Sequence, residues 1–171
     1  MNSGNASTQS QATILLVAIT IILFAILLPI LLGFLHLPEF KIRMIPGIFV
    51  ITNVLHIDDE SGAFDYDSRV IVLNTGPATY NNKDLKARIY RNEVPLNCVI
   101  ETLNGVDFIS TAHFGVDKLK GPGCQGLTWL PGELTSINLN DGTLHPGDTV
   151  RIDIIDKTTN EIISRHSYRV T

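Results

Sequence analysis

The uncharged stretch from Ala12 to Leu35 constrains the fold of this chain more than any other feature. It holds 24 residues, and no Asp, Glu, Lys or Arg occurs before Glu39. A helix of this length rises about 36 Å, enough to cross a bilayer hydrocarbon core about 30 Å thick. The stretch therefore predicts a transmembrane or assembly helix over residues 12–35. Pro29 predicts a bend in it, because proline lacks the backbone N–H of a helical residue.

The residues before this helix are small and polar. Residues 1–11 read MNSGNASTQSQ, which predicts a frayed leader that contains one glycosylation sequon, at Asn5. A secretory signal peptide has basic residues ahead of an apolar core of about 7–15 residues. This sequence has neither feature, so we expect the helix to be retained. Whether the leader itself is cleaved stays open.

Every formal charge lies beyond the helix, and the net charge is −4. No run of Lys or Arg occurs, so we expect no basic stripe and no nucleic-acid partner. The two cysteines, Cys98 and Cys124, have no zinc-type spacing. A disulfide between them is expected if the domain lies outside the cytoplasm. Two buried thiols are the alternative in a reducing compartment.

Residues 36–47 are interpreted as a linker, and residues 48–171 predict an all-β head. Short β-branched runs alternate with turns rich in Gly, Pro, Asn and Asp. The predicted strands are 48–56, 69–73, 86–91, 96–101, 107–111, 134–139, 149–155 and 162–170. Their number and spacing predict an antiparallel two-sheet sandwich, immunoglobulin-like or Greek-key, with Trp129 packed between the sheets.

No pattern in the sequence assembles a catalytic or metal site. The five histidines, His36, His56, His113, His145 and His166, share no ligand spacing, and the common nucleophile and phosphate-binding motifs are missing. The acidic segment 58–67 could supply oxygen ligands to Ca²⁺, but it lacks the EF-hand order and is better explained as a solvated turn. We therefore expect no enzyme, no cofactor and no small-molecule substrate.

The charges beside the helix and the character of the head predict opposite membrane orientations. Lys41 and Arg43 follow the helix and no cation precedes it, which predicts a cytoplasmic head by the positive-inside rule. The cysteines and the turn-rich β-domain favour a head outside the cytoplasm instead. With only two cations counted, the orientation stays open at this point.

Three parts of the sequence resemble archaeal type IV pilin-like proteins. Residues 14–23, ILLVAITIIL, are similar to the hydrophobic core of that family's N-terminal helix. The β-rich head is similar to the heads of many members, and the runs 129–133 and 144–156 resemble the strand pair that closes them. The leader departs from the family pattern because it contains no Lys or Arg. The resemblance implies an archaeal surface protein with its head outside the cell.

Two functions follow from these features. The first is a structural subunit of an extracellular type IV pilus-like filament, whose helix contacts the lipid bilayer before assembly and copies of itself afterwards. The second is a single-pass, membrane-anchored extracytoplasmic interaction or stator domain that stays in the cell envelope. In both, the helix surface carries the function through Ile14, Leu15, Leu16, Val17, Ile19, Ile22, Leu23, Phe24, Leu27, Pro29 and Leu32.

Overall fold

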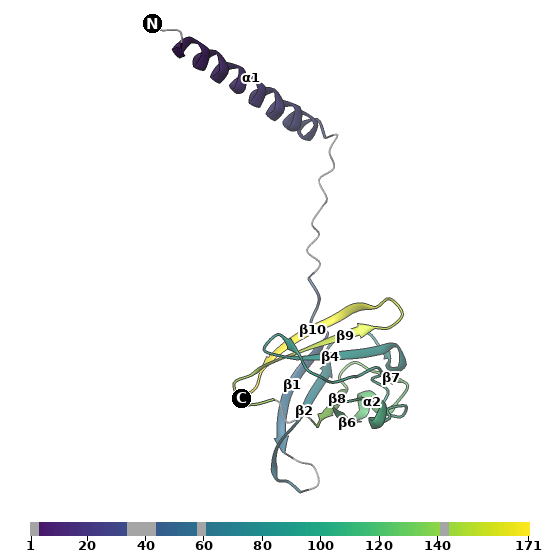
Figure 1. Ribbon diagram of the computed structural model, residues 1–171. Helices are drawn as coiled ribbons and strands as arrows, with labels where there is room; N and C mark the ends of the chain where they lie inside the picture. Colours follow the sequence, from purple (N-terminus) through teal and green to yellow (C-terminus); the bar gives the residue numbers. More distant parts are fainter. Residues whose placement is uncertain (1–3, 34–43, 58–60, 141–143) are drawn as a thin grey trace. The chain divides into compact units, whose positions relative to one another are not determined.

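The chain forms two compact units, an apolar helix and an all-β head, within Met1–Arg43 and Met44–Thr171 (Figure 1). The structure is a computed structural model that describes residues 4–33, 44–57, 61–140 and 144–171. Each unit is described by itself. Residues 36–43 of the predicted linker lie outside the described residues.

Helix α1 spans Gly4–Leu31, so it begins eight residues before the predicted start at Ala12. The leader predicted to be frayed is helical from Gly4 onward, because a formed helix extends at the gain of one hydrogen bond per added residue. At the other end, Gly33 has φ +71° and donates its N–H to the Ile30 carbonyl at 3.1 Å. A left-handed glycine is a common C-terminal cap. It explains why α1 ends short of the predicted boundary.

Among the described residues, the head consists of two four-stranded antiparallel sheets and a two-stranded pair. The first sheet has the order β1-β2-β8-β6 and the second β10-β9-β4-β5. The first contains β1 (Phe49–Ile57), β2 (Phe64–Asn74), β8 (Leu134–Leu139) and β6 (Val116–Lys120). The second contains β10 (Glu161–Arg169), β9 (Thr149–Asp156), β4 (Leu85–Arg91) and β5 (Val94–Pro95). The pair joins β3 (Tyr80–Asn81) to β7 (Thr128–Trp129), and the short helical turns are η1 (Asn82–Asp84), η2 (Ser110–Ala112) and α2 (Pro122–Gln125).

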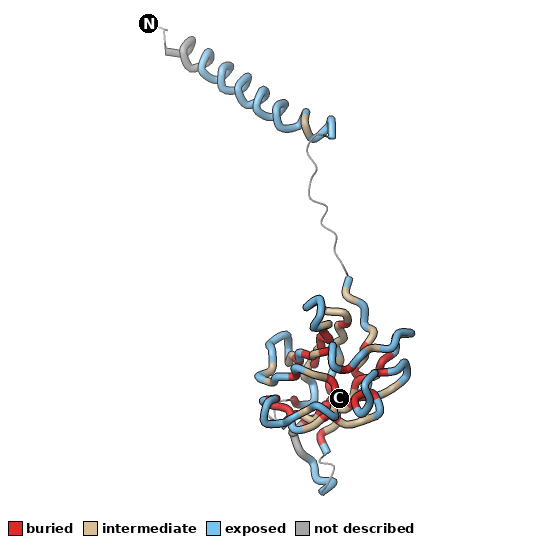
Figure 2. Tube along the Cα trace, turned by 90° about the vertical axis from the view of Figure 1, so that its right-hand side faces the viewer, coloured by how far each residue is buried: buried red, intermediate tan, exposed pale blue. Residues whose placement is uncertain are grey.

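The two sheets enclose one hydrophobic core, which confirms the predicted sandwich (Figure 2). Val150, Ile152 and Ile154 of β9 alternate along the strand and are fully buried. Trp129 is also fully buried, as predicted, with its ring centroid 4.5 Å from that of Phe49. The chain crosses between the sheets, since β2 pairs with β8 as well as with β1, and β4 pairs with β9 as well as with β5.

Strands β1 and β10, one edge strand from each sheet, lie next to each other. Three hydrogen bonds join this region, and we call them the β1–β10 seam. Phe49 N–H donates to Ser164 Oγ at 2.9 Å, Ile51 N–H to His166 Nδ1 at 3.1 Å, and Arg165 N–H to the Pro46 carbonyl at 3.0 Å. Two of the acceptors are side chains, so the seam is not a regular backbone ladder.

Because His166 Nδ1 is an acceptor in the seam, we expect the head to lose stability in mild acid. Burial lowers the pKa values of His56 and His166, and for His56 the charge of His145 adds to the effect. The unfolded chain then binds more protons than the folded one below about pH 6.5. The stabilisation is complete above about pH 6.5 and is lost as the pH falls through the folded pKa values. The urea midpoint should fall between pH 7.5 and pH 5.

His166→Asn is the matched variant for this effect. Its amide oxygen can accept the Ile51 N–H but does not titrate in this range. Asp156 does not add to the pH dependence in this range, because hydrogen bonds from Thr158 lower the pKa of its carboxyl group and keep it charged. The variant should show a shallower pH dependence than the native chain. An unchanged slope would show that His166 does not contribute.

The structure corrects two predicted strands and adds four. Residues 96–101 pair only through a single bridge between Ile100 and Ala87. Residues 107–111 form a turn and the start of η2, because the Asn104 side chain accepts the Val106 N–H and donates to Asp107. Strand β6 and the two-residue strands β3, β5 and β7 were not predicted. The other six predicted strands coincide with β1, β2, β4, β8, β9 and β10.

Candidate membrane anchor and head surfaces

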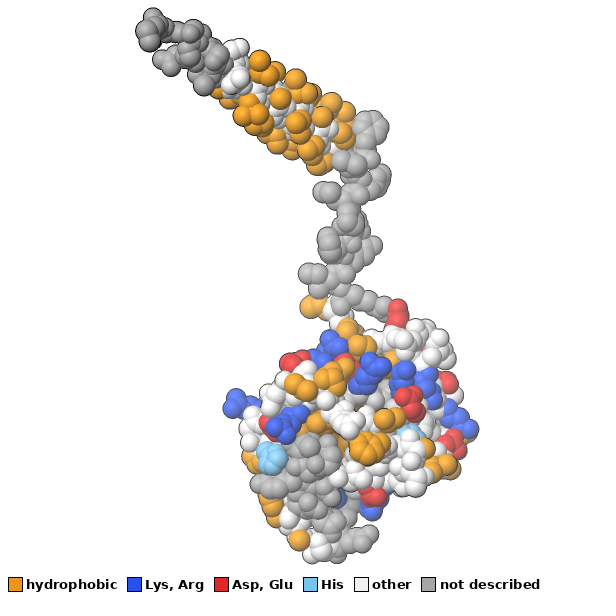
Figure 3. All heavy atoms as spheres, viewed as in Figure 1, with side chains coloured by type: hydrophobic (Ala, Val, Ile, Leu, Met, Phe, Trp, Pro, Cys, Tyr) orange, Lys and Arg blue, Asp and Glu red, His pale blue; other side chains and the backbone are white. Residues whose placement is uncertain are grey.

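Helix α1 is the candidate membrane anchor. Its residues from Ser10 to Leu31 have a mean hydropathy of 3.2 and contain no buried position. These 22 residues rise about 33 Å, the thickness of a hydrocarbon core. By length and composition, the segment can cross a membrane. Figure 3 shows its orange side chains as a continuous apolar surface.

The residues predicted to carry the helix function lie on all sides of α1 rather than on one stripe. Apart from Pro29 they are between 49% and 67% exposed, and they comprise Ile14, Leu15, Leu16, Val17, Ile19, Ile22, Leu23, Phe24, Leu27 and Leu32. Leu32 follows the last helical residue, and Pro29 lies in the last turn. A helix that is apolar all round is suited to lipid or to the interior of a helix bundle.

Local hydrogen bonding in α1 suits an apolar environment. The Thr20 hydroxyl donates to the Leu16 carbonyl at 2.8 Å, so it needs no partner outside the helix. Pro29 has no N–H to donate to the Ala25 carbonyl. The bend predicted at Pro29 stays a prediction. Asn5, the sequon residue, lies in the first turn of α1.

The two cysteines are not joined by a disulfide, contrary to the expectation for an extracytoplasmic head. Cys124 lies in α2, where its thiol donates to the Gly121 carbonyl at 3.3 Å and lies against Gly105. Cys98 lies in the loop after β5 and packs on the edge of the core. Each cysteine is a free thiol with its own packing surroundings. The spacing of the two cysteines in the sequence does not show this.

We therefore expect the two thiols to differ in reactivity. Burial raises the pKa of Cys124 to about 11, and the thiolate is the reactive form. Iodoacetamide at pH 8 should modify the half-buried Cys98 in the native protein and leave Cys124 unmodified until urea unfolds the head. Peptide mass spectrometry measures both. Recovery of a Cys98–Cys124 crosslinked peptide without reductant would contradict the structure.

The histidines that the structure describes do not meet at a metal site. Among the described residues, no group of three or more His, Cys, Asp or Glu side chains could hold a metal ion. His166 belongs to the seam, while His56 Nδ1 lies 3.1 Å from the Ser68 hydroxyl. His36 and residues 58–60 of the acidic segment lie outside the described residues.

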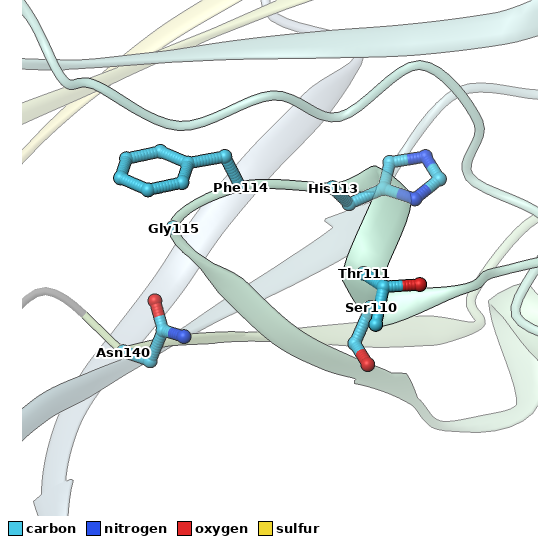
Figure 4. Close-up of a pocket in the computed structure, with 6 residues that line it drawn as sticks. All are labelled: Ser110, Thr111, His113, Phe114, Gly115 and Asn140. Carbon is cyan, nitrogen blue, oxygen red and sulfur yellow. The ribbon is translucent and has the colours of Figure 1, made fainter.

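A pocket of about 440 Å³ opens beside η2 (Figure 4). It is lined by Ser110, Thr111, His113, Phe114, Gly115 and Asn140. Figure 4 shows Phe114 and Asn140 on one side, Ser110 and Thr111 on another, and the His113 ring directed away from Asn140. His113 Nδ1 is 2.9 Å from the Ile109 carbonyl and its ring stacks on Phe108. The titratable side chain among the lining residues is His113.

The outer face of the second sheet contains charged residues whose proximity was not predicted from the sequence. Asp153 is 1% exposed and accepts two hydrogen bonds from Arg165, each 2.7 Å long. The Arg151 Nε lies 3.6 Å from the same carboxylate, and the Arg151 guanidinium lies 3.9 Å from the centroid of the Tyr90 ring. Strand β4 is far from β9 and β10 in the chain, so the register between β4 and β9 was the missing information.

Comparisons with known proteins leave the family open. No protein-family model and no curated protein matches the sequence. One similar solved structure is the archaellum periplasmic stator protein FlaG from Sulfolobus acidocaldarius, with 12% identity and a TM-score of 0.40, covering 70% of this chain and 95% of that chain. Another is the complex of FlaF and FlaG from the same organism, with 11% identity and a TM-score of 0.39, covering 78% and 97%. Similarity at this level establishes neither a shared fold nor a family, and the resemblance to pilin-like proteins stays a prediction.

Proposed function

We propose that this chain is a single-pass membrane protein of the cell envelope, held by α1, with its β-sandwich head outside the cytoplasm. The observation that supports anchoring is that no residue along the span Ser10–Leu31 is buried. Burial of apolar surface is favourable by about 25 cal/mol per Å². A span this apolar is therefore stable only inside lipid or against other apolar helices.

The first candidate role is a structural subunit of a type IV pilus-like filament. The same helix surface would contact lipid before assembly and other copies of α1 afterwards. The apolar surface on all sides of α1 supports this role, because a helix that is apolar all round suits the interior of a helix bundle.

The second candidate role is an interaction or stator domain that stays anchored in the envelope. The observation that favours it is the continuity of α1 from Gly4 through the apolar span. The polar residues before Ala12 belong to the same helix as the span, so a cleavage point there would lie within helical backbone.

The mature N-terminus and the location of the chain distinguish the two roles. Membranes and sheared surface filaments are collected from native cells, and peptides are identified by mass spectrometry. A chain that starts between Ser7 and Ala12 and is found in filaments supports the subunit. An intact N-terminus found only in membranes supports the anchored domain. Release of the full chain from membranes by alkaline carbonate would overturn both.

A further inference from the structure

The outer face of the second sheet is defined by strand alternation. Val150, Ile152 and Ile154 of β9 are buried in the core, so Arg151 and Asp153 occupy the opposite face. Residues paired across neighbouring strands share a face. Four register pairs therefore extend it across the sheet: Arg88 and Arg165 each with Asp153, Tyr90 with Arg151, and Lys86 with Ile155.

This face is strongly basic on an acidic head. We call it the basic face, and its cationic members are Lys86, Arg88, Arg151, Arg165 and Arg169. Their acidic neighbours are Asp153 and Glu93, so five positive and two negative charges leave +3. From Met44 on, the sequence has 11 Lys and Arg against 16 Asp and Glu, a net charge of −5. The rest of the head therefore carries −8. Figure 3 shows Lys and Arg side chains gathered over the upper part of the head, where β4, β9 and β10 lie.

The acidic residues hold two of the five cations in place. Asp153 forms the paired hydrogen bonds with Arg165, and Glu93 pairs with Arg151, which also stacks on Tyr90. The other three cations, Lys86, Arg88 and Arg169, form no ion pair with any described residue. They are at least partly exposed and remain available to an external anion.

The basic face adjoins the segment through which the chain enters the head. Arg165 N–H donates to the Pro46 carbonyl, and Gly47 lies against the Arg165 carbonyl. Ten residues, 34–43, separate Gly33 beyond α1 from Met44. A chain of ten residues spans at most about 36 Å when fully extended. If α1 lies in a membrane, the tether therefore keeps the head at a high local concentration near that membrane's surface.

We propose that the basic face docks the head onto anionic lipid headgroups of the membrane that holds α1. The proposal rests on the membrane anchoring of the proposed function. Guanidinium groups bind phosphate oxygens through paired, charge-assisted hydrogen bonds. Each Lys or Arg near an anionic membrane surface contributes about a fivefold gain in affinity, within a Debye length of about 10 Å. The acidic remainder of the head is repelled by the same surface, so docking selects one orientation.

The full chain, isotope-labelled and reconstituted in nanodiscs, tests this docking. Discs of phosphatidylglycerol are compared with discs of phosphatidylcholine, each carrying a gadolinium-chelate headgroup lipid that broadens nearby amide signals. Signals of β4, β9 and β10 should broaden in the anionic discs and much less in the neutral ones. The broadening should weaken when salt is raised from about 0.1 M to about 1 M, which shortens the Debye length to about 3 Å.

Two double variants with the same change of charge provide the control. Removing Arg88 and Arg169 as R88Q/R169Q should lower the ratio of docked to free head about thirtyfold. K83Q/K118Q changes two exposed lysines outside the basic face, and it should dock like the native chain.

Each outcome of these experiments either supports or overturns docking of the basic face onto anionic lipid. Equal broadening in both kinds of disc, or native docking by R88Q/R169Q, would overturn the proposal. So would a response of these signals to a single-stranded oligonucleotide with none to anionic lipid. Failure of the chain to co-elute with nanodiscs would overturn the anchoring as well, whereas co-elution without docking would overturn only this inference.

Discussion

Replacing Trp129 with alanine is expected to lower the free energy of unfolding of the head by about 3–5 kcal/mol. The side chain is fully buried and packs against Phe49. Its Nε1 donates to the Glu133 carbonyl at 2.8 Å, which holds the turn before β8. Gly123 of α2 approaches the same ring so closely that a Cβ there would clash with it. Trp129→Ala therefore removes core packing and leaves a cavity against α2.

Circular dichroism during urea unfolding is the appropriate measurement, because Trp129 is the only tryptophan and its fluorescence disappears with the substitution. Phe114→Ala is the matched control, since this aromatic side chain is 65% exposed, and its effect should stay within about 0.5 kcal/mol. A Trp129→Ala variant no less stable than Phe114→Ala would show that the core is not organised around this ring.

Placing Leu16→Arg and Leu23→Arg together in α1 is expected to abolish membrane insertion. An arginine near the centre of a transmembrane helix costs about 2.5–3.5 kcal/mol on insertion scales, so the pair costs about 6 kcal/mol. Both leucines are more than half exposed in the span, and the helix offers no acidic partner. Carbonate extraction of membranes measures the result.

The control for this variant is L16A/L23A, which shortens the same two side chains without adding charge. It should remain in the carbonate-resistant fraction with the native chain. Retention of the double arginine variant in that fraction would contradict the assignment of α1 as the membrane span.

The elements that the sequence predicted well are those whose signal is local. The uncharged run of α1 and the alternation of Val150, Ile152 and Ile154 in β9 depend only on neighbouring residues, so both appear in the structure near their expected positions. The end of α1 differs because a single glycine, Gly33, stops the helix while the apolar run continues past it.

The elements that the sequence missed depend on irregular or distant pairing. Strand β6 contains a register shift between Val116 and Lys118, so its buried residues, Val116 and Leu119, are three positions apart instead of two or four. That spacing hides the strand from an alternation test. The basic face was not predicted for a different reason. Arg88 and Arg165 each lie beside Asp153 only because of the register of β4, β9 and β10.

The β1–β10 seam has a mechanical consequence for a head that is held by its N-terminal side. Tension applied through Met44 reaches the bond between Pro46 and Arg165 first. The next bonds along the chain are the two that the Ile48 carbonyl accepts from Thr75, beside the start of the β1–β2 ladder at Phe49. The bond between Pro46 and Arg165 lies outside that ladder, so residues 44–47 can lengthen under tension while the β1–β2 ladder and the core behind it remain closed. The first residues of the head therefore give way under load before the β-sandwich does.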